Sequence, residues 1–471
     1  MKPHLYRDKI ILAPMVRANS LPFRLLCLKY GADLVYTEEL IDHRLCSCKR
    51  LENKILGTVD YVDEQGEIIL RTCPELEADK LVLQIGSNNP ERALKAARLV
   101  SQDIVGLDFN FGCPKAFSLS GGMGAALLDK PDEIEQLLTT AVKNLQLPVT
   151  CKIRILPDLG KTLELVRLIE RCGVSAIAVH GRTKEQRPRH DNQNHVLLEI
   201  SKTLDRIPLI ANGGSNCFKT YSDVIKFRDS TNSSSVMIAR AAMKNPSIFK
   251  SDNQLEPIEN VIEEFLKLAV TYDNYVSNTK YSMQTLLSSG HFGAEFMQKF
   301  HAANDMESIF RLFPNLSDWY QANKITLDSR NQFYDERQLE NRHLEEYISE
   351  LRLRLESEQI ELVIDTVPYS SKIYGSKTPK AQLSDQTNRA HDKPVFEVFQ
   401  VQSKDSDAKM KGGFYCTVTY RNVCYLNKSF SSSKKNAEHS TAMLVCERLK
   451  LTDLASYRAK VASVCRGRNV T

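Results

Sequence analysis

The sequence contains no apolar run of the length that a membrane span needs, which is roughly 18 residues, although 42% of its 471 residues are hydrophobic. Its twelve cysteines show no paired spacing of the kind that binds zinc, since Cys46 and Cys48 are too close together for that pattern. The segment after Met1 has no secretory hydrophobic region. These absences predict a cytoplasmic protein without a membrane span or a bound metal, in which most cysteines are small buried hydrophobic residues.

Charge is distributed unevenly along the chain, behind a formal net charge of only +5. From Pro368 to the end there are twelve Lys and six Arg against five Asp and three Glu, a net charge of +10. The preceding residues carry the remaining 45 basic and 50 acidic side chains, a net charge of −5. A basic segment on a mildly acidic body indicates an appendage that binds a polyanion.

Short apolar runs alternate with amphipathic stretches up to about residue 245. They predict eight strands, at residues 10–16, 32–38, 81–85, 105–109, 149–153, 176–180, 208–212 and 236–239. Eight near-continuous apolar runs separated by helical segments favour a (β/α)8 TIM barrel over residues 1–250, with a hairpin inserted at 58–72. An open doubly wound sheet is the alternative, but no Gly-x-Gly-x-x-Gly follows the first run.

Strand patterns fade after about residue 256, where helical apolar periods predict an all-helical domain over 256–365 that ends in a long charged helix at 338–363. The composition of residues 366–378 predicts a linker. A polar helix at 379–390, strands at 395–402, 414–420 and 423–430, and a helix at 434–451 then give an α-β-β-β-α domain over 379–452. A basic tail fills 453–471.

Polar residues gather at the predicted strand ends, where TIM barrels place their chemistry. Seven of the eight ends carry candidates, which are Pro14, Met15 and Val16, Gln84, Asn110 and Cys113, Lys152 and Arg154, His180, Asn212, Gly213 and Gly214, and Ala239 and Arg240. A strand-end Gln or Asn often only satisfies the backbone, and His180 fits a core histidine equally well. The convergence of seven ends on one rim is the stronger indication of a ligand site.

Two features of this rim suggest a particular ligand. Lys152 lies in an apolar strand, where its charge is costly to bury without a partner, so we expect it to contact a ligand. The glycines after Asn212 let backbone N–H groups approach a phosphate closely, and the loops after strands seven and eight are the usual phosphate position in such barrels. An ordinary glycine turn is the alternative. A phosphate there, with Gln84 and Lys152 deeper in the mouth, fits flavin mononucleotide (FMN).

With these residues in view, the chain resembles the tRNA-dihydrouridine synthase family. The matching motifs occur in the family's order over residues 5–340, and they are Ala13-Pro14-Met15-Val16, Asn110-Phe111-Gly112-Cys113-Pro114 with the loop Ser120-Gly121-Gly122-Met123-Gly124, Cys151-Lys152-Ile153-Arg154, His180-Gly181-Arg182-Thr183, and Asn212-Gly213-Gly214. Two departures are Asn-Gly-Gly where many relatives have Asn-Gly-Asp, and Ala-Arg where they have Gly-Arg. Both changes retain the backbone N–H groups that would bind the phosphate, so we expect phosphate binding to be little affected.

The resemblance implies an FMN-dependent reductase of a uridine in the tRNA D-loop, position 20 in the eukaryotic branch with an extra C-terminal module. It implies that Cys113 is the catalytic acid and that Asn110, Lys152 and Arg154 contact the uracil. It also implies that Lys152, together with the other strand-end candidates, holds FMN. Reduced flavin supplies hydride to carbon 6, and the thiol supplies a proton to carbon 5. NADPH or NADH is the expected reductant, tRNA the expected partner, and a monomer the expected state.

The C-terminal module resembles a double-stranded RNA-binding domain, because residues 414–420 alternate as a strand and Ser433-Lys434-Lys435-Asn436-Ala437-Glu438 opens the last helix. The resemblance implies that Lys434 and Lys435 bind phosphates across a groove; a solvated basic face is the alternative. Two other functions remain open. A flavin dehydrogenase acting on a free pyrimidine would need no basic module, and a non-catalytic RNA-binding protein would not need Asn110, Cys113, Lys152 and Arg154.

Overall fold

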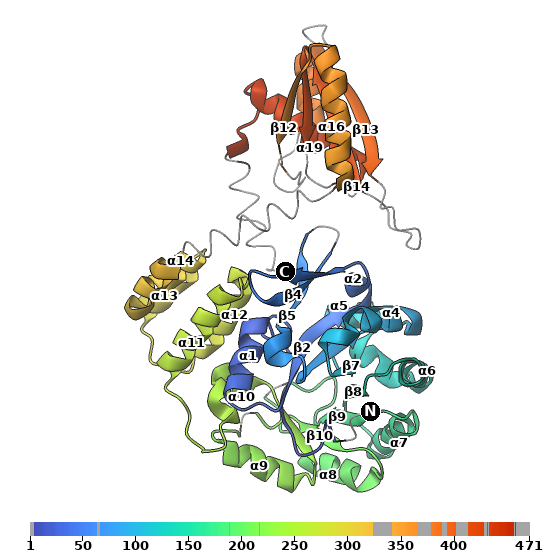
Figure 1. The fold of residues 1–471 in the computed structure, drawn as a ribbon. Coiled ribbons are helices and arrows are strands. Elements are labelled where there is room, and N and C mark those ends of the chain that lie inside the picture. The colour runs from blue at the N-terminus through green and yellow to red at the C-terminus, as the bar shows by residue number, and fades with distance from the viewer. Residues whose placement is uncertain are drawn as a thin grey trace. The chain divides into compact units, whose positions relative to one another are not determined.

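A computed structural model describes residues 4–63, 66–187, 189–215, 217–323, 342–365, 367, 378–388, 393–401, 413–427, 431, 433–455 and 457. The chain divides into two compact units, residues 1–324 and 325–471. Each unit is described by itself below (Figure 1). In the described part of the chain, no helix combines the length and apolar character needed to cross a membrane.

The first unit is built on a closed barrel of eight parallel strands, in the order β1-β11-β10-β9-β8-β7-β6-β2. The strands are β1 Ile10–Leu12, β2 Leu34–Ile41, β6 Leu81–Gly86, β7 Gly106–Phe111, β8 Val149–Arg154, β9 Ala176–His180, β10 Leu209–Asn212 and β11 Ser235–Ile238. Nearly all their residues are buried because helices cover the outside. The predicted (β/α)8 barrel is confirmed.

Helices surround the barrel, as Figure 1 shows. They are α1 Leu21–Lys29, α2 Asp42–Cys46, α3 Pro74–Glu77, α4 Pro90–Val100, α5 Ala116–Ser120, α6 Pro131–Asn144, α7 Leu159–Arg171, α8 Asn194–Thr203, α9 Tyr221–Ser230 and α10 Arg240–Lys244, with 3-10 turns at Ser101–Asp103, Gly124–Asp129 and Pro246–Phe249. Side-chain caps begin two of the longer ones, since Asn89 accepts from the Arg92 amide at 2.9 Å and Asp158 from the Lys161 amide at 2.7 Å.

Side chains fill the barrel interior and leave the ligand region at the carboxyl ends of the strands. The interior cluster is Tyr6, Ile11, Ala13, Leu34, Tyr36, Val82, Ala176, Ala178, Ile210 and Met237. The predicted hairpin after strand two is confirmed as β4 Thr58–Val62 and β5 Ile68–Thr72, with a third antiparallel strand, β3 Lys49–Asn53, beside it. The sequence Lys-Arg-Leu-Glu-Asn carries little strand pattern, which is why β3 was not predicted.

The helices α11 Ile258–Thr271, α12 Val276–Leu287, α13 Ala294–Ala302 and α14 Met306–Phe310 follow the barrel, and residues 314–323 are also helical. Helix α11 packs on the barrel helix α1, where the Phe23 and Phe265 rings meet edge to face with centroids 6.2 Å apart. Helix α12 reaches the barrel mouth, because the guanidinium carbon of Arg17 lies 5.5 Å from the centroid of the Tyr281 ring. The helical segment and the first barrel loop are therefore packed together.

The second unit is a four-stranded sheet with helices on both faces, in the strand order β12-β15-β14-β13. Its elements are α16 Arg342–Ser357, β12 Glu361–Asp365, α18 Pro379–Asn388, β13 Val395–Val401, β14 Gly413–Tyr420, β15 Val423–Asn427 and α19 Lys434–Arg448. The predicted α-β-β-β-α order is confirmed by α18, β13, β14, β15 and α19.

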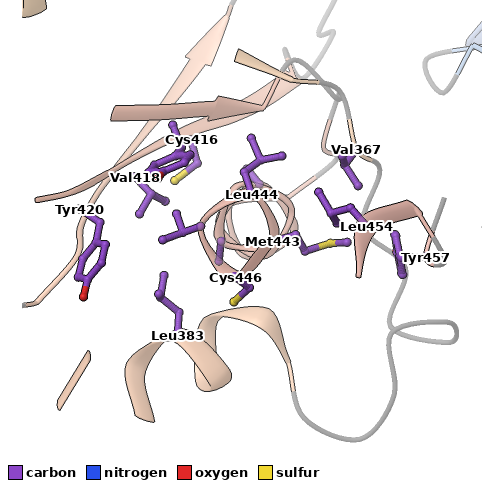
Figure 2. Close-up of a cluster of buried hydrophobic side chains, with 14 residues drawn as sticks. Val367, Leu383, Cys416, Val418, Tyr420, Met443, Leu444, Cys446, Leu454 and Tyr457 are labelled. Atoms are coloured by element: carbon purple, nitrogen blue, oxygen red, sulfur yellow. The ribbon is translucent and has the colours of Figure 1, made fainter. Parts of the chain in front are cut away.

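Helices α18 and α19 cover one face of this sheet. Cys416 and Val418 of β14 pack against Met443 of α19, and Leu383 is the residue that α18 contributes to the cluster (Figure 2). Helix α18 is otherwise largely polar, and its buried residues are Pro379, Leu383 and Thr387. The polar pattern noted in the sequence therefore corresponds to a helix that contributes only Leu383 to the buried hydrophobic cluster.

The second face of the sheet corrects the expected all-helical domain over 256–365. Of the predicted long helix at 338–363, residues 338–341 lie outside the described part of the chain and Arg342–Ser357 form α16. The apolar face of α16 packs on the sheet residues Tyr415, Cys424 and Leu426. Residues Glu361–Asp365 form strand β12, which pairs in parallel with β15. A helical apolar period cannot tell which domain a helix packs on. Leu362 lies seven residues after Leu355 and so continued the helical period, although Ile360, Leu362 and Ile364 alternate as in a strand. Most of the predicted linker at 366–378, and the tail beyond Tyr457, lie outside the described residues.

Replacing Leu351 by alanine should destabilise the C-terminal unit by about 2–4 kcal/mol, because Leu351 is 3% exposed in the cluster between α16 and the sheet. Leu353, on the same helix, is 70% exposed, so Leu353→Ala is the matched control and should cost less than about 0.5 kcal/mol. Hydrogen exchange of the β14 amides in the full chain measures both. Equal protection in the two variants would show that α16 does not stabilise this sheet.

Candidate active site

Cys113 lies just after β7, in a turn that the strand-end residue Asn110 holds in place. The side-chain oxygen of Asn110 accepts hydrogen bonds from the backbone N–H groups of Gly112, at 3.0 Å, and Cys113, at 3.1 Å. The turn is also fixed from β8, since Arg154 donates from Nε to the Gly112 carbonyl at 2.8 Å and from Nη1 to the Thr183 carbonyl at 2.9 Å. Three loops of the barrel mouth are thus joined around one half-buried thiol.

Burial raises the pKa of the Cys113 thiol to about 11, and the nearby charge of Glu39 adds to the increase. The side chain is therefore a protonated thiol at neutral pH and can act as an acid. Glu39, near the end of β2, was not among the predicted site residues. Strand two was the one strand end without a candidate, although Glu38-Glu39 at that end was a visible signal.

A group of basic side chains lines the mouth beside this thiol. In the strand register, Lys152 of β8 lies opposite Asn110 of β7, and Arg154 of β8 lies opposite His180 of β9. Burial, followed by the charge of Arg154, lowers the pKa of Lys152 to about 8. Burial also lowers the pKa of Arg154 to about 10, with the repulsion of Arg182 as the second cause.

His180 is neutral at the base of this group. Burial first, and then the charges of Lys152, Arg154, Arg182 and Arg240, lower the pKa of His180 well below its usual value. Nη1 of Arg182 lies 3.0 Å from Nε2 of His180, a contact that the sequence analysis did not anticipate. Partly buried cations that repel one another fit a site for an anion. Lys152, Arg154 and Arg240 were among the predicted strand-end candidates, whereas Arg182 was not.

Gly213 and Gly214 follow β10 with φ of +117° and +64°, a backbone that glycine adopts readily. A Cβ atom on Gly213 would lie 1.9 Å from Oδ1 of Asn192. This oxygen is buried without a hydrogen-bond partner among the described residues. A phosphate group needs backbone N–H groups that it can approach closely and positive charge nearby. The backbone of Gly213 and Gly214 and the side chains of Arg182 and Arg240 provide both, so these residues fit the phosphate end of FMN.

Other candidates fall into three groups. Gln84 donates from Nε2 to the Asp108 carboxylate at 2.7 Å inside the barrel, and Asn212 donates from Nδ2 to the Met237 carbonyl at 2.8 Å. Both amide groups therefore fix neighbouring strands. Pro14, Met15 and Val16 form the loop after β1, where Val16 is 42% exposed.

Lys434 and Lys435 are exposed at the first turn of α19, in the other unit. Among the described residues, no group of His, Cys, Asp and Glu is arranged to hold a metal ion.

The profile of the family described as "Dihydrouridine synthase (Dus)" matches residues 11–332. The chain belongs to this family of oxidoreductases. It is 36% identical over 331 residues to the Saccharomyces cerevisiae tRNA-dihydrouridine(20) synthase [NAD(P)+], covering 66% of this chain and 85% of that one. It is 37% identical over 317 residues to the Schizosaccharomyces pombe tRNA-dihydrouridine(20) synthase [NAD(P)+], covering 65% of each. A solved tRNA-dihydrouridine(20) synthase dsRBD domain matches 20% of this chain and 95% of its own length at 24% identity, with a TM-score of 0.17.

Proposed function

We propose that this protein is a tRNA-dihydrouridine synthase that reduces the 5,6 double bond of a uridine in the D-loop of tRNA, at position 20, with NADPH or NADH as the source of electrons. The observation that carries the proposal is the presence of one protonated thiol, Cys113, beside Asn110, Lys152 and Arg154 at the mouth of a closed barrel. The position-20 synthases of the two yeasts support this substrate. The cytoplasmic location and monomeric state expected from the sequence stay predictions.

FMN fits the basic mouth and, when bound, supplies the hydride that carbon 6 of the uracil receives. Gly213, Gly214 and Arg240 would hold its phosphate, and Lys152 and His180 would contact the rest of the cofactor. Because His180 is neutral, it can accept or donate a hydrogen bond there without adding charge. Lys152 is the cation able to stabilise negative charge on the ring.

The proton for carbon 5 comes from Cys113. The thiol S–H bond breaks as the C–H bond forms, and the thiolate that remains regains a proton from solvent. Asn110 holds the backbone on either side of this thiol, and Arg154 ties the same turn to β8. The uridine has to leave its stack for its face to reach the thiol, because a stacked, paired base hides that face.

Binding of FMN to the apoprotein should weaken as pH rises through about 8, because Lys152 loses its proton over this range. The lowered pKa means that the cation is present below about 8 and absent above it. We expect the affinity to fall by up to about tenfold between pH ~7 and ~9, measured by quenching of flavin fluorescence. In Lys152→Met the affinity should be lower at pH ~7 and should no longer fall over this interval. The same decline in the variant would assign the titration to another group.

Replacing Lys434 and Lys435 together by alanine should weaken tRNA binding and flatten its dependence on salt. Each lysine that binds a phosphate contributes about one unit to the slope of log affinity against log salt. The flavin should stay bound, because these lysines belong to the other compact unit. Arg448→Ala, an exposed position at the opposite end of the same helix, is the control and should leave the slope nearly unchanged. An unaltered slope in the double variant would count against a phosphate contact.

A further inference from the structure

Arg17 lies in the loop after β1, in a backbone conformation that is unusual for its residue type. Its φ is +71°, in the left-handed region that a residue with a Cβ adopts only at a cost in free energy. Oε2 of Glu38 accepts from the Arg17 amide at 3.0 Å. The amides of Ala18 and Asn19 donate to the Met15 carbonyl at 3.2 and 3.1 Å. Strained conformations that the surroundings fix in this way cluster at functional sites.

A buried asparagine anchors the same loop to the barrel. Asn19 is 1% exposed, and its Nδ2 donates to the carbonyls of Ala13 and Tyr36, both at 2.8 Å. The Asn19 carbonyl accepts in turn from Nη1 of Arg24 at 2.8 Å. These bonds join the loop to the end of β1, to β2 and to α1, so the fold itself holds Arg17 in place at the barrel mouth.

The guanidinium of Arg17 lies over an aromatic ring and leaves its hydrogen-bond donors unused. Its carbon is 5.5 Å from the centroid of the Tyr281 ring on α12, within the range of a cation–π contact. Among the residues that the structure describes, its N–H groups donate no hydrogen bond and form no ion pair. Arg17 is partly exposed and Tyr281 is 37% exposed. A fixed guanidinium with free planar donors suits a phosphate, which accepts two such bonds side by side.

We propose that Arg17 binds a backbone phosphate of tRNA beside the uridine that enters the barrel mouth. The inference rests on the proposed function, in which the substrate is a tRNA. A uridine that leaves its stack brings its flanking phosphates to the rim of the pocket that receives it, and the loop after β1 is part of this rim. The exposed Val16 and the Tyr281 ring add apolar and aromatic surface to the cation, a combination that binds unpaired nucleotides. The phosphate of FMN is expected at Gly213, which follows β10, two strands away from β1 in the barrel.

The test is tRNA binding by the full-length flavoprotein over a range of salt concentrations, measured by fluorescence anisotropy of end-labelled tRNA. In Arg17→Ala the affinity should fall by about tenfold at low salt, and the slope of log affinity against log salt should become shallower by about one unit. The flavin content and the rate at which NADPH reduces the flavin should equal those of wild type. Arg98→Ala removes an exposed arginine from the outer helix α4; it is the control and should leave the slope unchanged.

Three further variants separate phosphate binding from the packing of α12. Arg17→Lys retains the charge and should keep the slope within about half a unit of wild type, but it loses the paired donors, so the affinity should fall about threefold. Tyr281→Phe keeps the ring and should bind tRNA as wild type does. Tyr281→Ala removes the surface beneath the guanidinium and should weaken tRNA binding by about three- to tenfold.

An unaltered salt slope in Arg17→Ala, with the flavin still bound, would overturn the inference, and a lower melting temperature with unchanged tRNA affinity would leave Arg17 only a structural contact to Tyr281. Slower reduction of the flavin by NADPH, with tRNA binding unchanged, would overturn it by assigning Arg17 to the phosphates of the dinucleotide. If Arg17→Ala does not retain flavin, Arg17→Gln is measured in the same way, and an unaltered slope there overturns it equally.

The proposed function fails in a distinguishable manner. If wild type forms no dihydrouridine while Arg17→Ala weakens tRNA binding and flattens its salt dependence, the role of Arg17 stands and the reaction is not the proposed one. If wild type forms dihydrouridine and Arg17→Ala binds tRNA with the same affinity and slope, the reaction stands and Arg17 does not bind the RNA.

Discussion

Replacement of Cys113 by alanine is expected to reduce dihydrouridine formation in tRNA by at least about 100-fold, the usual contribution of a positioned acid. The thiol is the acid of the proposed reaction because its raised pKa of about 11 keeps it protonated at neutral pH. Alanine leaves the hydrogen bonds from the backbone of Gly112 and Cys113 to Asn110 possible. The variant should therefore retain its flavin and its affinity for tRNA.

The measurement is the dihydrouridine content of tRNA after incubation with the purified protein and NADPH, determined by nucleoside mass spectrometry. Cys46→Ala is the control, since Cys46 is a free thiol on α2 that contacts the Arg92 carbonyl. It should keep nearly full activity. Equal activity of Cys113→Ala and wild type would remove the assigned role from Cys113.

Replacement of Gly213 by alanine is expected to weaken FMN binding by roughly 30- to 1000-fold. A Cβ atom there would lie 1.9 Å from Oδ1 of Asn192, and φ of +117° is strained for any residue with a Cβ. Backbone strain and overpacking each cost about 1–3 kcal/mol. Rotation of the Asn192 side chain can relieve part of this clash, but the strain of the positive φ is relieved only by moving the backbone N–H groups that would bind the phosphate.

Gly57 provides a matched control for this change. It also has a positive φ, +65°, but no atom lies within 4 Å of a Cβ built on it. Gly57→Ala should cost some stability and leave the affinity for FMN unchanged. The flavin content of the purified proteins and the dissociation constants of their apo forms give the comparison. If Gly213→Ala binds FMN as wild type does, the phosphate does not bind at this loop.

The barrel could be predicted because its strands are buried on both faces, so each appears in the sequence as a short apolar run. The run at 176–180 matches β9 at both ends. The ends of other strands were less predictable. Asn110 and Arg154 lie within β7 and β8, and hydrophobicity cannot extend a strand through polar residues that face a ligand.

The candidate site was predictable as a set of strand ends and not as a set of contacts. Sequence spacing brought Cys113, Lys152 and His180 to one rim, but it could not place Glu39 beside the thiol, because a Glu-Glu pair gives no sign of which carboxyl faces inward. The assignment of α16 failed for a related reason. Its apolar stripe was visible, whereas its partner, the sheet face with Tyr415 and Leu426, lies some 60 residues further along the chain.

The most direct test of the account is a single turnover without oxygen, in which the flavoprotein is reduced with NADPH, freed of excess reductant and mixed with tRNA that lacks dihydrouridine. The account predicts that wild type reoxidises its flavin and forms about one dihydrouridine per flavin, whereas Cys113→Ala does neither at a comparable rate. Reoxidation by tRNA at the same rate in both proteins, or a protein that binds no flavin at all, would contradict it.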